Sequence, residues 1–162
     1  MLDIWGRYFW LIALAVSLVN AVWVWMRSRA EVARDPDLGA GYAKLVIGYL
    51  TVANLPWFVM GYGIVIGGVP SLWYYFRPQD GDPYVLMWFA SILVLWALGT
   101  AWVYAWGGAE MLARHPATFN FRAYASSARF IKAIWAIGLI GGIMGFVGMW
   151  LMDIPVDALS LL

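Results

Sequence analysis

The sequence predicts an all-α integral membrane protein with four transmembrane helices, arranged as two tandem helical hairpins. Of its 162 residues 64% are hydrophobic and 12% are charged, whereas roughly a quarter of the residues in a soluble domain are charged. A helix needs about 20 apolar residues to cross about 30 Å of hydrocarbon. Four charge-free runs qualify: Tyr8–Met26, Leu45–Phe76, Pro83–Ala109 and Ala133–Met152.

An internal repeat is the second indication of this fold. Residues Trp23–Pro36 contain Trp-Val, Ala-Glu and Ala-Arg-x-Pro elements, and Trp102–Pro116 repeats them in order with Leu112 as one inserted residue. Because both hairpins run in the same direction, we expect the repeats to be related by an axis along the membrane normal and not by inversion.

The four spans occupy most of the chain and leave no room for a separate soluble domain. We therefore expect a single membrane domain over residues 1–162. Its predicted parts are a first hairpin at 1–76, a second at 83–152 and a short tail at 153–162.

The first span continues in helix-favouring residues beyond Met26, so its helix should project about two turns out of the hydrocarbon. Asp35-Pro36 ends it, because the residue before a proline is disfavoured in the helical region. Lys44 marks the entry of the second span. Pro56 lies midway along that span and predicts a kink, because proline lacks an amide donor and crowds the preceding turn. Pro70 is expected to close the helix.

A wet loop is predicted between the hairpins, at Ser71–Asp82, with an aromatic stretch followed by a polar turn. The third span should repeat the first and continue as helix through Gly107-Gly108 to Arg114. The insertion between Pro116 and Arg129 mixes aromatic and polar residues, a composition typical of a short interfacial helix before the fourth span.

Orientation is predicted by the basic residues, eight of ten of which flank the two loops within the hairpins. The positive-inside rule places these loops in the cytoplasm and both termini outside. We expect the cell (inner) membrane, with its lipids as partners. The eight residues are Arg27, Arg29, Arg34, Lys44, Arg114, Arg122, Arg129 and Lys132.

Glycines predict close helix packing, because small residues let helix backbones approach in a membrane. The fourth span contains two overlapping GxxxG pairs, Gly138 with Gly142 and Gly141 with Gly145. The full predicted packing set is Gly138, Gly141, Gly142, Gly145, Gly148, Gly61, Gly63 and Gly67.

A ligand or solute path is the alternative use of the spans. No Asp, Glu, Lys, Arg or His lies deep in the four runs, which argues against a proton relay or a cation-driven carrier. The residues that could serve a neutral solute are Asn20, Asn54, Pro56 and Trp57. The Gly61-Tyr62-Gly63 triplet is similar to a potassium-channel filter, but its neighbours favour glycine packing.

The turn residues of the two repeats are Glu31, Arg34, Pro36, Glu110, Arg114 and Pro116. The Arg-x-Pro turns resemble those of rotary-ATPase proteolipid subunits. That family needs a carboxylate in mid-membrane, which these spans lack, so we expect no membership. The two glutamates are expected to form solvated ion pairs with neighbouring arginines at helical spacing. We expect His115, the single histidine, to be a solvated turn residue.

Twelve tryptophans are more than interface belts need, and Trp57 and Trp96 fall near mid-depth. They could contact lipid, a quinone or a pigment. With no cysteine, the chain offers no thiolate metal site and no disulfide. We expect no metal site, no cofactor beyond bound lipid, and no nucleic-acid partner.

Packing motifs are abundant in this sequence and reactive groups are scarce. The leading functional hypothesis is therefore a non-catalytic small membrane subunit that packs into a larger assembly or with copies of itself. Two alternatives stay open. One is a homo-oligomeric channel or facilitator for a neutral or weakly polar solute. The other is a quinone- or pigment-contacting subunit of an electron-transfer complex.

Overall fold

A computed structural model describes residues 2–119 and 127–151, and this part of the chain is helical with no strand. Four helical segments are long and apolar enough to cross a membrane, as predicted, which indicates a membrane protein. The elements in chain order are α1 (Leu2–Val32), α2 (Leu38–Thr51), α3 (Leu55–Val65), η1 (Leu72–Phe76), η2 (Pro78–Asp80), α4 (Pro83–Tyr104), α5 (Gly108–Arg114), η3 (Pro116–Thr118) and α6 (Ala128–Leu151).

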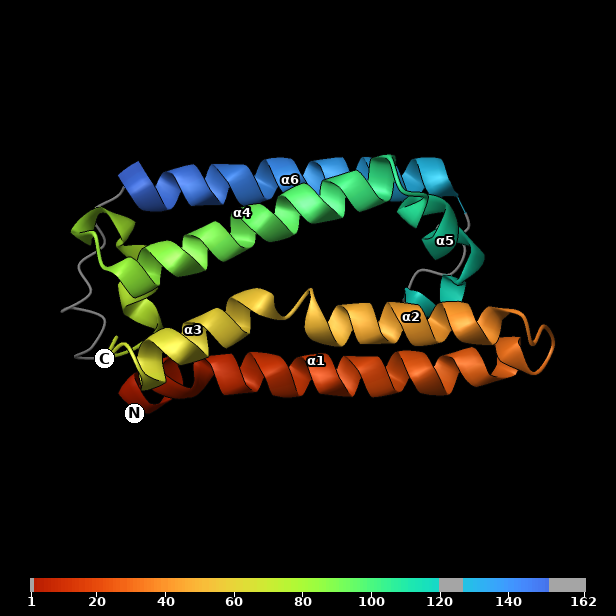
Figure 1. The fold of residues 1–162 in the computed structure, drawn as a ribbon, viewed down its shortest axis with the longest axis horizontal. Coiled ribbons are helices and arrows are strands. Elements are labelled where there is room, and N and C mark those ends of the chain that lie inside the picture. Colours follow the sequence, from red (N-terminus) through yellow and green to blue (C-terminus); the bar gives the residue numbers. More distant parts are fainter. Residues whose placement is uncertain (1, 120–126, 152–162) are drawn as a thin grey trace.

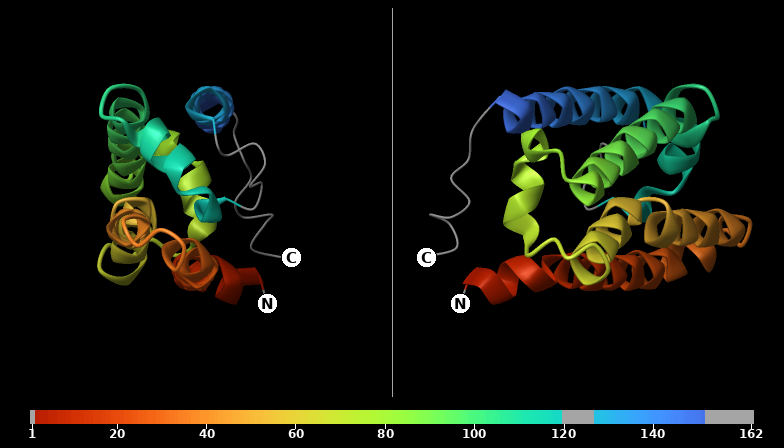
Figure 2. Two further views of the ribbon diagram at one scale, coloured as in Figure 1. Left: turned by 90° about the vertical axis from the view of Figure 1, so that its right-hand side faces the viewer. Right: turned by 60° about the vertical axis from the view of Figure 1, so that its left-hand side comes forward.

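The helices form two hairpins that meet at their ends (Figure 1). In one hairpin α1 runs beside α2 and α3, and in the other α4 runs beside α6. The hairpins pack directly where α3 contacts α4. At the opposite end α5 and η3 cross from one hairpin to the other, and η3 packs on α1. Between these two connections α2 and α4 lie apart, which Figure 2 shows from two further sides.

The predicted kink is an interruption between α2 and α3, at residues 52–54. The break leaves the carbonyls of Tyr49 and Leu50 without their usual helical donors. The side-chain amide of Asn54 donates to both, at 3.0 and 3.2 Å. The backbone carbonyl of Asn54 accepts from the amide of Phe58, and this bond begins α3. Asn54 is buried, so its amide satisfies backbone groups that water does not reach.

The second span ends earlier than predicted, because its last helix, α3, ends at Val65 and not at Pro70. Gly68 has a φ of 74°, a conformation that glycine adopts at little cost. This turn lets the amide of Val69 donate to the carbonyl of Gly63 at 3.0 Å and reverses the chain. The pair Gly67-Gly68, and not Pro70, therefore ends the helix.

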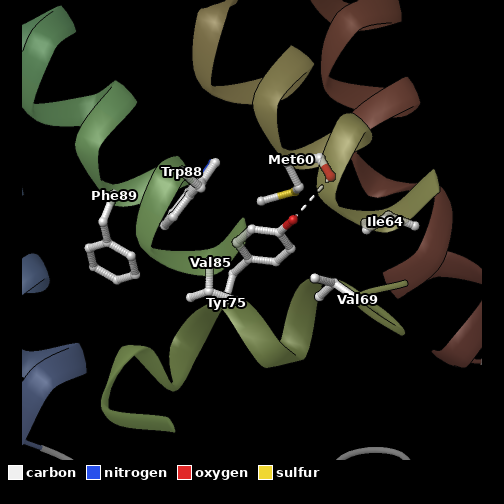
Figure 3. Packing of buried hydrophobic residues seen from close by; sticks show 7 residues of the cluster. All are labelled: Met60, Ile64, Val69, Tyr75, Val85, Trp88 and Phe89. Atoms are coloured by element: carbon white, nitrogen blue, oxygen red, sulfur yellow. Dashed lines mark hydrogen bonds between the residues drawn. The ribbon is translucent and has the colours of Figure 1, made fainter. Parts of the chain in front are cut away.

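The connection between the hairpins is not simply a wet loop. Tyr75 in η1 is 1% exposed, and its hydroxyl donates to the carbonyl of Met60 at 3.1 Å (Figure 3). Burial raises the pKa of Tyr75, and the Asp82 carboxylate raises it further. The surrounding core joins α3, η1 and α4 and consists of Met60, Ile64, Val69, Tyr75, Val85, Trp88 and Phe89. The prediction of a solvated loop was wrong for Tyr75 because aromatic side chains here fill the space between two hairpins.

The third helix does not continue to Arg114 as predicted. α4 ends at Tyr104, and Gly107 has a φ of 75°, so α5 sets off in a new direction. Gly108 then packs on Trp102, where an added Cβ would lie 2.6 Å from a ring carbon. The repeat suggested a continuous helix, but the two glycines turn the chain toward the first hairpin.

Two predicted features fall outside the described residues. The proposed interfacial segment between Pro116 and Arg129 is described only at its ends, and residues 120–126 are not described. The tail at 153–162 also lies outside the described part of the chain. At the start of this insertion, Pro116–Thr118 forms the short helix η3.

Candidate functional site: an apolar cavity between the hairpins

A cavity of about 1180 Å³ opens between the hairpins on the side of the basic loops. It follows from the fold, because α3 and α4 hold the hairpins together at one end and α5 and η3 at the other. Its lining comes from α1, α2, α4, α5, η3 and α6. A second cavity of about 510 Å³ lies between α4 and α6. The lining residues that it shares with the first are Trp102, Leu112, Thr118, Phe119 and Trp135.

The main cavity is about as deep as one leaflet. Its lining on α1 extends from Val19 to Arg27, a distance of roughly 12 Å at 1.5 Å per helical residue. Half of the hydrocarbon thickness of a bilayer is about 15 Å. The cavity therefore reaches from the basic end of the bundle to about the middle of the spans.

Charge is concentrated at the basic end of the cavity. Arg27 of α1 and Lys44 of α2 both line it. The Nε of Arg27 donates to the carbonyl of Trp23 at 3.4 Å, and the guanidinium lies 5.8 Å from the centroid of the Trp23 ring. Among residues 2–119 and 127–151, no Asp or Glu lines the cavity. The opening is thus cationic and the interior is largely apolar.

The far wall of the cavity is fixed by contacts between α4 and α6. Trp135 of α6 donates from Nε1 to the hydroxyl of Thr100 at 3.0 Å. Its ring lies directly over Gly99, where any Cβ would collide with it. On the opposite side, Gly48 of α2 faces open space, and a Cβ there would meet no atom within 4 Å. The cavity therefore has an aromatic wall at Trp135, and Gly48 of α2 lies on the opposite side.

A buried polar cluster joins the hairpins at the basic end. Tyr42 of α2 donates its hydroxyl to the carboxylate of Glu31 and accepts from the amide of Ala117 at 3.1 Å. Tyr42 and Ala117 are fully buried. One tyrosine thereby connects α1, α2 and η3.

His115 belongs to the same cluster, and the prediction that it is a solvated turn residue was wrong. It is 6% exposed, and its ring packs edge-on against Tyr42 with centroids 4.7 Å apart. Nδ1 lies 2.6 Å from the carbonyl of Met111, so Nδ1 carries the proton. Gly41 makes room for the ring, because a Cβ at that position would collide with it.

The two repeated glutamates have different partners. Glu110 pairs with Lys132 of α6 at 2.9 Å and not with an arginine of its own helix. The hydrogen bond from Lys132 holds the pKa of Glu110 below its usual range. Glu31 instead accepts from Tyr42. The two glutamates occupy matching positions in the sequence repeat, but they contact different kinds of side chain.

The remaining turn residues lie at the ends of helices. Arg34 and Pro36 are exposed in the turn between α1 and α2. Arg114 is exposed at the end of α5, and Pro116 begins η3. They shape the turns that carry the buried cluster, but the cluster itself is made by other side chains.

The predicted packing glycines divide into two groups. Gly61 lies against Trp10, with a Cβ placed 2.7 Å from its ring. Gly63 lies against the hydroxyl of Tyr75 and against Tyr84, and Gly67 lies against Tyr84. Gly142 lies against Trp96 of α4. At the other four, an added Cβ would meet no atom of the described residues within 4 Å: Gly138, Gly141, Gly145 and Gly148.

The predicted path residues are not gathered at one site. Asn20 is exposed and lines the main cavity. Asn54 is buried beyond it and is engaged by two carbonyls. Pro56 is buried in α3, and Trp57 packs edge-on against Phe9 at 5.8 Å. The lining residues Gly48, Trp135 and Tyr49 were not predicted, because their common role depends on how the hairpins are placed.

Comparison with known proteins adds no assignment. No protein-family model, curated protein or solved structure matches this chain significantly. Within residues 2–119 and 127–151, no group of three His, Asp or Glu side chains is placed to hold a metal ion. Function must therefore be argued from the cavity and from the exposed helix faces.

Proposed function

We propose that this chain is a non-catalytic membrane subunit that associates, within the membrane, with other subunits or with copies of itself. The observation that carries the proposal is the outward face of α6. This helix packs on its own chain through one side, which includes Trp135, Gly142 and Phe146. Of the four spans it has the smallest buried share.

The outward face combines small residues with large apolar ones. Within the described part of the chain, Gly141 and Gly145 have no neighbour within 4 Å of an added Cβ, and Ile137 and Met144 beside them are each 70% exposed. Glycine costs about 1 kcal/mol relative to alanine in a helix interior. In lipid, helices associate by close packing at small residues. A second helix seated on this face would use both the shallow groove at the glycines and the side chains that border it.

The test is the size of the complex formed by glycine variants. Gly141→Leu and Gly145→Leu fill the proposed groove without touching the chain's own core. We expect the double variant, extracted in mild detergent, to run as a smaller species than the wild type in native mass spectrometry. Ala97→Leu is the matched control, because Ala97 is exposed on α4. Equal complex size for the wild type, the double variant and the control would refute the proposal.

The finer arrangement of the subunit is part of the same proposal. The eight basic residues that flank the hairpin turns support a cytoplasmic location for those turns and an outside location for both termini. The shared sequence elements at Trp23 and Trp102 support a duplicated hairpin. Single cysteines introduced at Arg29 and Gln79 test the orientation, because a membrane-impermeant maleimide should label position 79 in intact cells and position 29 after lysis.

The channel alternative is less well supported by the geometry. It relies on Asn54, whose amide already donates to two backbone carbonyls. A solute passing this point would have to compete with those bonds. The quinone or pigment alternative fits the aromatic wall at Trp102 and Trp135, and the lipid experiment below includes a quinone as a competitor.

A further inference from the structure

We propose that the cavity between the hairpins is a binding site for one anionic phospholipid, with an acyl chain in the cavity and the phosphate between Arg27 and Lys44. This inference does not depend on the α6 face, which lies on the other side of that helix. It assigns a ligand class to a site formed entirely within one chain.

Charge complementarity selects the headgroup. Arg27 and Lys44 stand on the neighbouring helices α1 and α2, at the basic end of the cavity, and the described residues that line it include no carboxylate. A guanidinium offers a fork of donors that matches phosphate geometry, and an ammonium adds a compact charge. The ring of Trp23 beneath Arg27 helps to hold the guanidinium in place. A phosphate at this opening would place one anionic group beside both cations.

The dimensions of the cavity select an extended apolar tail. Its volume of about 1180 Å³ exceeds the range of about 300–1,000 Å³ typical of small-molecule pockets. Its depth on α1 is close to that of one leaflet. Between the cationic opening and the α2–α3 break, most lining side chains are apolar, among them Leu45, Leu98 and Trp102. Charge at one end and hydrocarbon along the rest is the polarity of a membrane lipid.

The side walls explain why such a lipid would be retained and not simply exchanged with the bilayer. Trp135 is hydrogen-bonded to Thr100 and rests on Gly99. At the basic end, Tyr42 joins α2 to η3. The first set of contacts fixes α6 on α4 within the second hairpin, and the second joins the two hairpins at the basic end, so contacts within the chain anchor the walls on both sides of the cavity. An unfilled apolar space of this size would be costly in the membrane, and a lipid tail fills it.

Native mass spectrometry with defined lipids tests the proposal. The full chain in mild detergent is titrated with phosphatidylglycerol or with phosphatidylcholine of the same acyl chains. We expect one tightly held phosphatidylglycerol per chain. Arg27→Gln with Lys44→Gln should weaken its binding about five-fold per charge, or on the order of 25-fold for both. Phosphatidylcholine binding should change little.

Two matched controls separate site binding from general effects. Arg29→Gln with Arg34→Gln removes the same charge from exposed basic residues that do not line the cavity, and should leave the affinity within about two-fold of the wild type. Gly48→Phe fills the cavity from α2, and Ile47→Phe places the same ring on the exposed side of that helix. Only the ring at position 48 should reduce the binding of both lipids.

Several results would overturn the assignment. They are equal binding of the two lipids to the wild type, an equal loss in both pairs of charge variants, or unchanged binding in Gly48→Phe. Displacement of phosphatidylglycerol by a neutral long-chain quinone at equal concentration would identify a different occupant. Because the α6 variants Gly141→Leu and Gly145→Leu should retain the lipid, failure of the subunit proposal and failure of this one are distinguishable.

Discussion

Replacing Tyr42 by phenylalanine should separate the two hairpins at their basic end. The change removes one oxygen and leaves the packing of the ring against His115 in place. The amide of Ala117, which is fully buried, loses its acceptor. A buried donor left without a partner costs about 1–3 kcal/mol. Glu31 is half-buried and can recover water, so its lost hydrogen bond adds less, about 0.5–1.5 kcal/mol.

We therefore expect Tyr42→Phe to lower the free energy of unfolding by about 1.5–4.5 kcal/mol. The assay is denaturant unfolding in a fixed detergent at neutral pH, monitored by tryptophan fluorescence. Tyr49→Phe is the matched control, because Tyr49 lies on the same helix and is 37% exposed. If the two variants unfold with the same free energy within about 0.5 kcal/mol, the reasoning about the buried amide is wrong.

Three further predictions concern the opposite half of the bundle. Folding raises the pKa of Tyr75, so the tyrosine ionises at lower pH in the unfolded chain, and wild-type stability should fall above about pH 10. Tyr75→Phe should lose less stability at alkaline pH in the same unfolding assay, and equal losses in the two proteins would contradict this. Gly63→Ala should cost about 1–3 kcal/mol by displacing Tyr75 from the carbonyl of Met60, whereas Gly48→Ala should cost nothing; thermal unfolding of both variants compares them. Asn54→Leu should destabilise by about 1–3 kcal/mol because two carbonyls lose their donor, and unchanged stability with lost solute flux in liposomes would favour the channel alternative instead.

The spans could be predicted because they depend on local composition. Four long apolar runs identify four crossing helices whatever their neighbours are. The break at Pro56 was also predictable, since a proline inside a helix removes a donor wherever the helix lies. The sequence did not reveal how the break is stabilised. Asn54 could have bonded another helix, and the structure places its amide on the two preceding carbonyls.

The errors arose where a residue's role depends on distant parts of the chain. The sequence repeat predicts helix at Gly107-Gly108, but Gly107 adopts a positive φ that its own neighbours do not demand. His115 was read as solvated because its neighbours are polar. It is buried because α5 carries it onto Gly41 and Tyr42. A glycine directly before an aromatic residue at the start of a helix is a weak signal of such a close approach.

The cavity could not be predicted at all, although its charged residues were noticed. Arg27 and Lys44 are among the basic residues that predict the orientation, and Trp102 begins the second repeat. Their common role appears only when α2 and α4 are held apart by contacts at both ends. Such spacing is a property of the tertiary arrangement, and no local pattern records it.

Cross-linking in the native membrane tests the proposed association most directly. The chain has no cysteine, so Met144→Cys on the outward face of α6 gives a unique thiol, and Ala97→Cys on α4 gives the matched control. Treatment with a short bismaleimide should yield a discrete adduct, with a second copy or with one partner protein, from position 144 and not from position 97. Monomer alone from position 144, or the same adducts from both positions, would contradict association through this face.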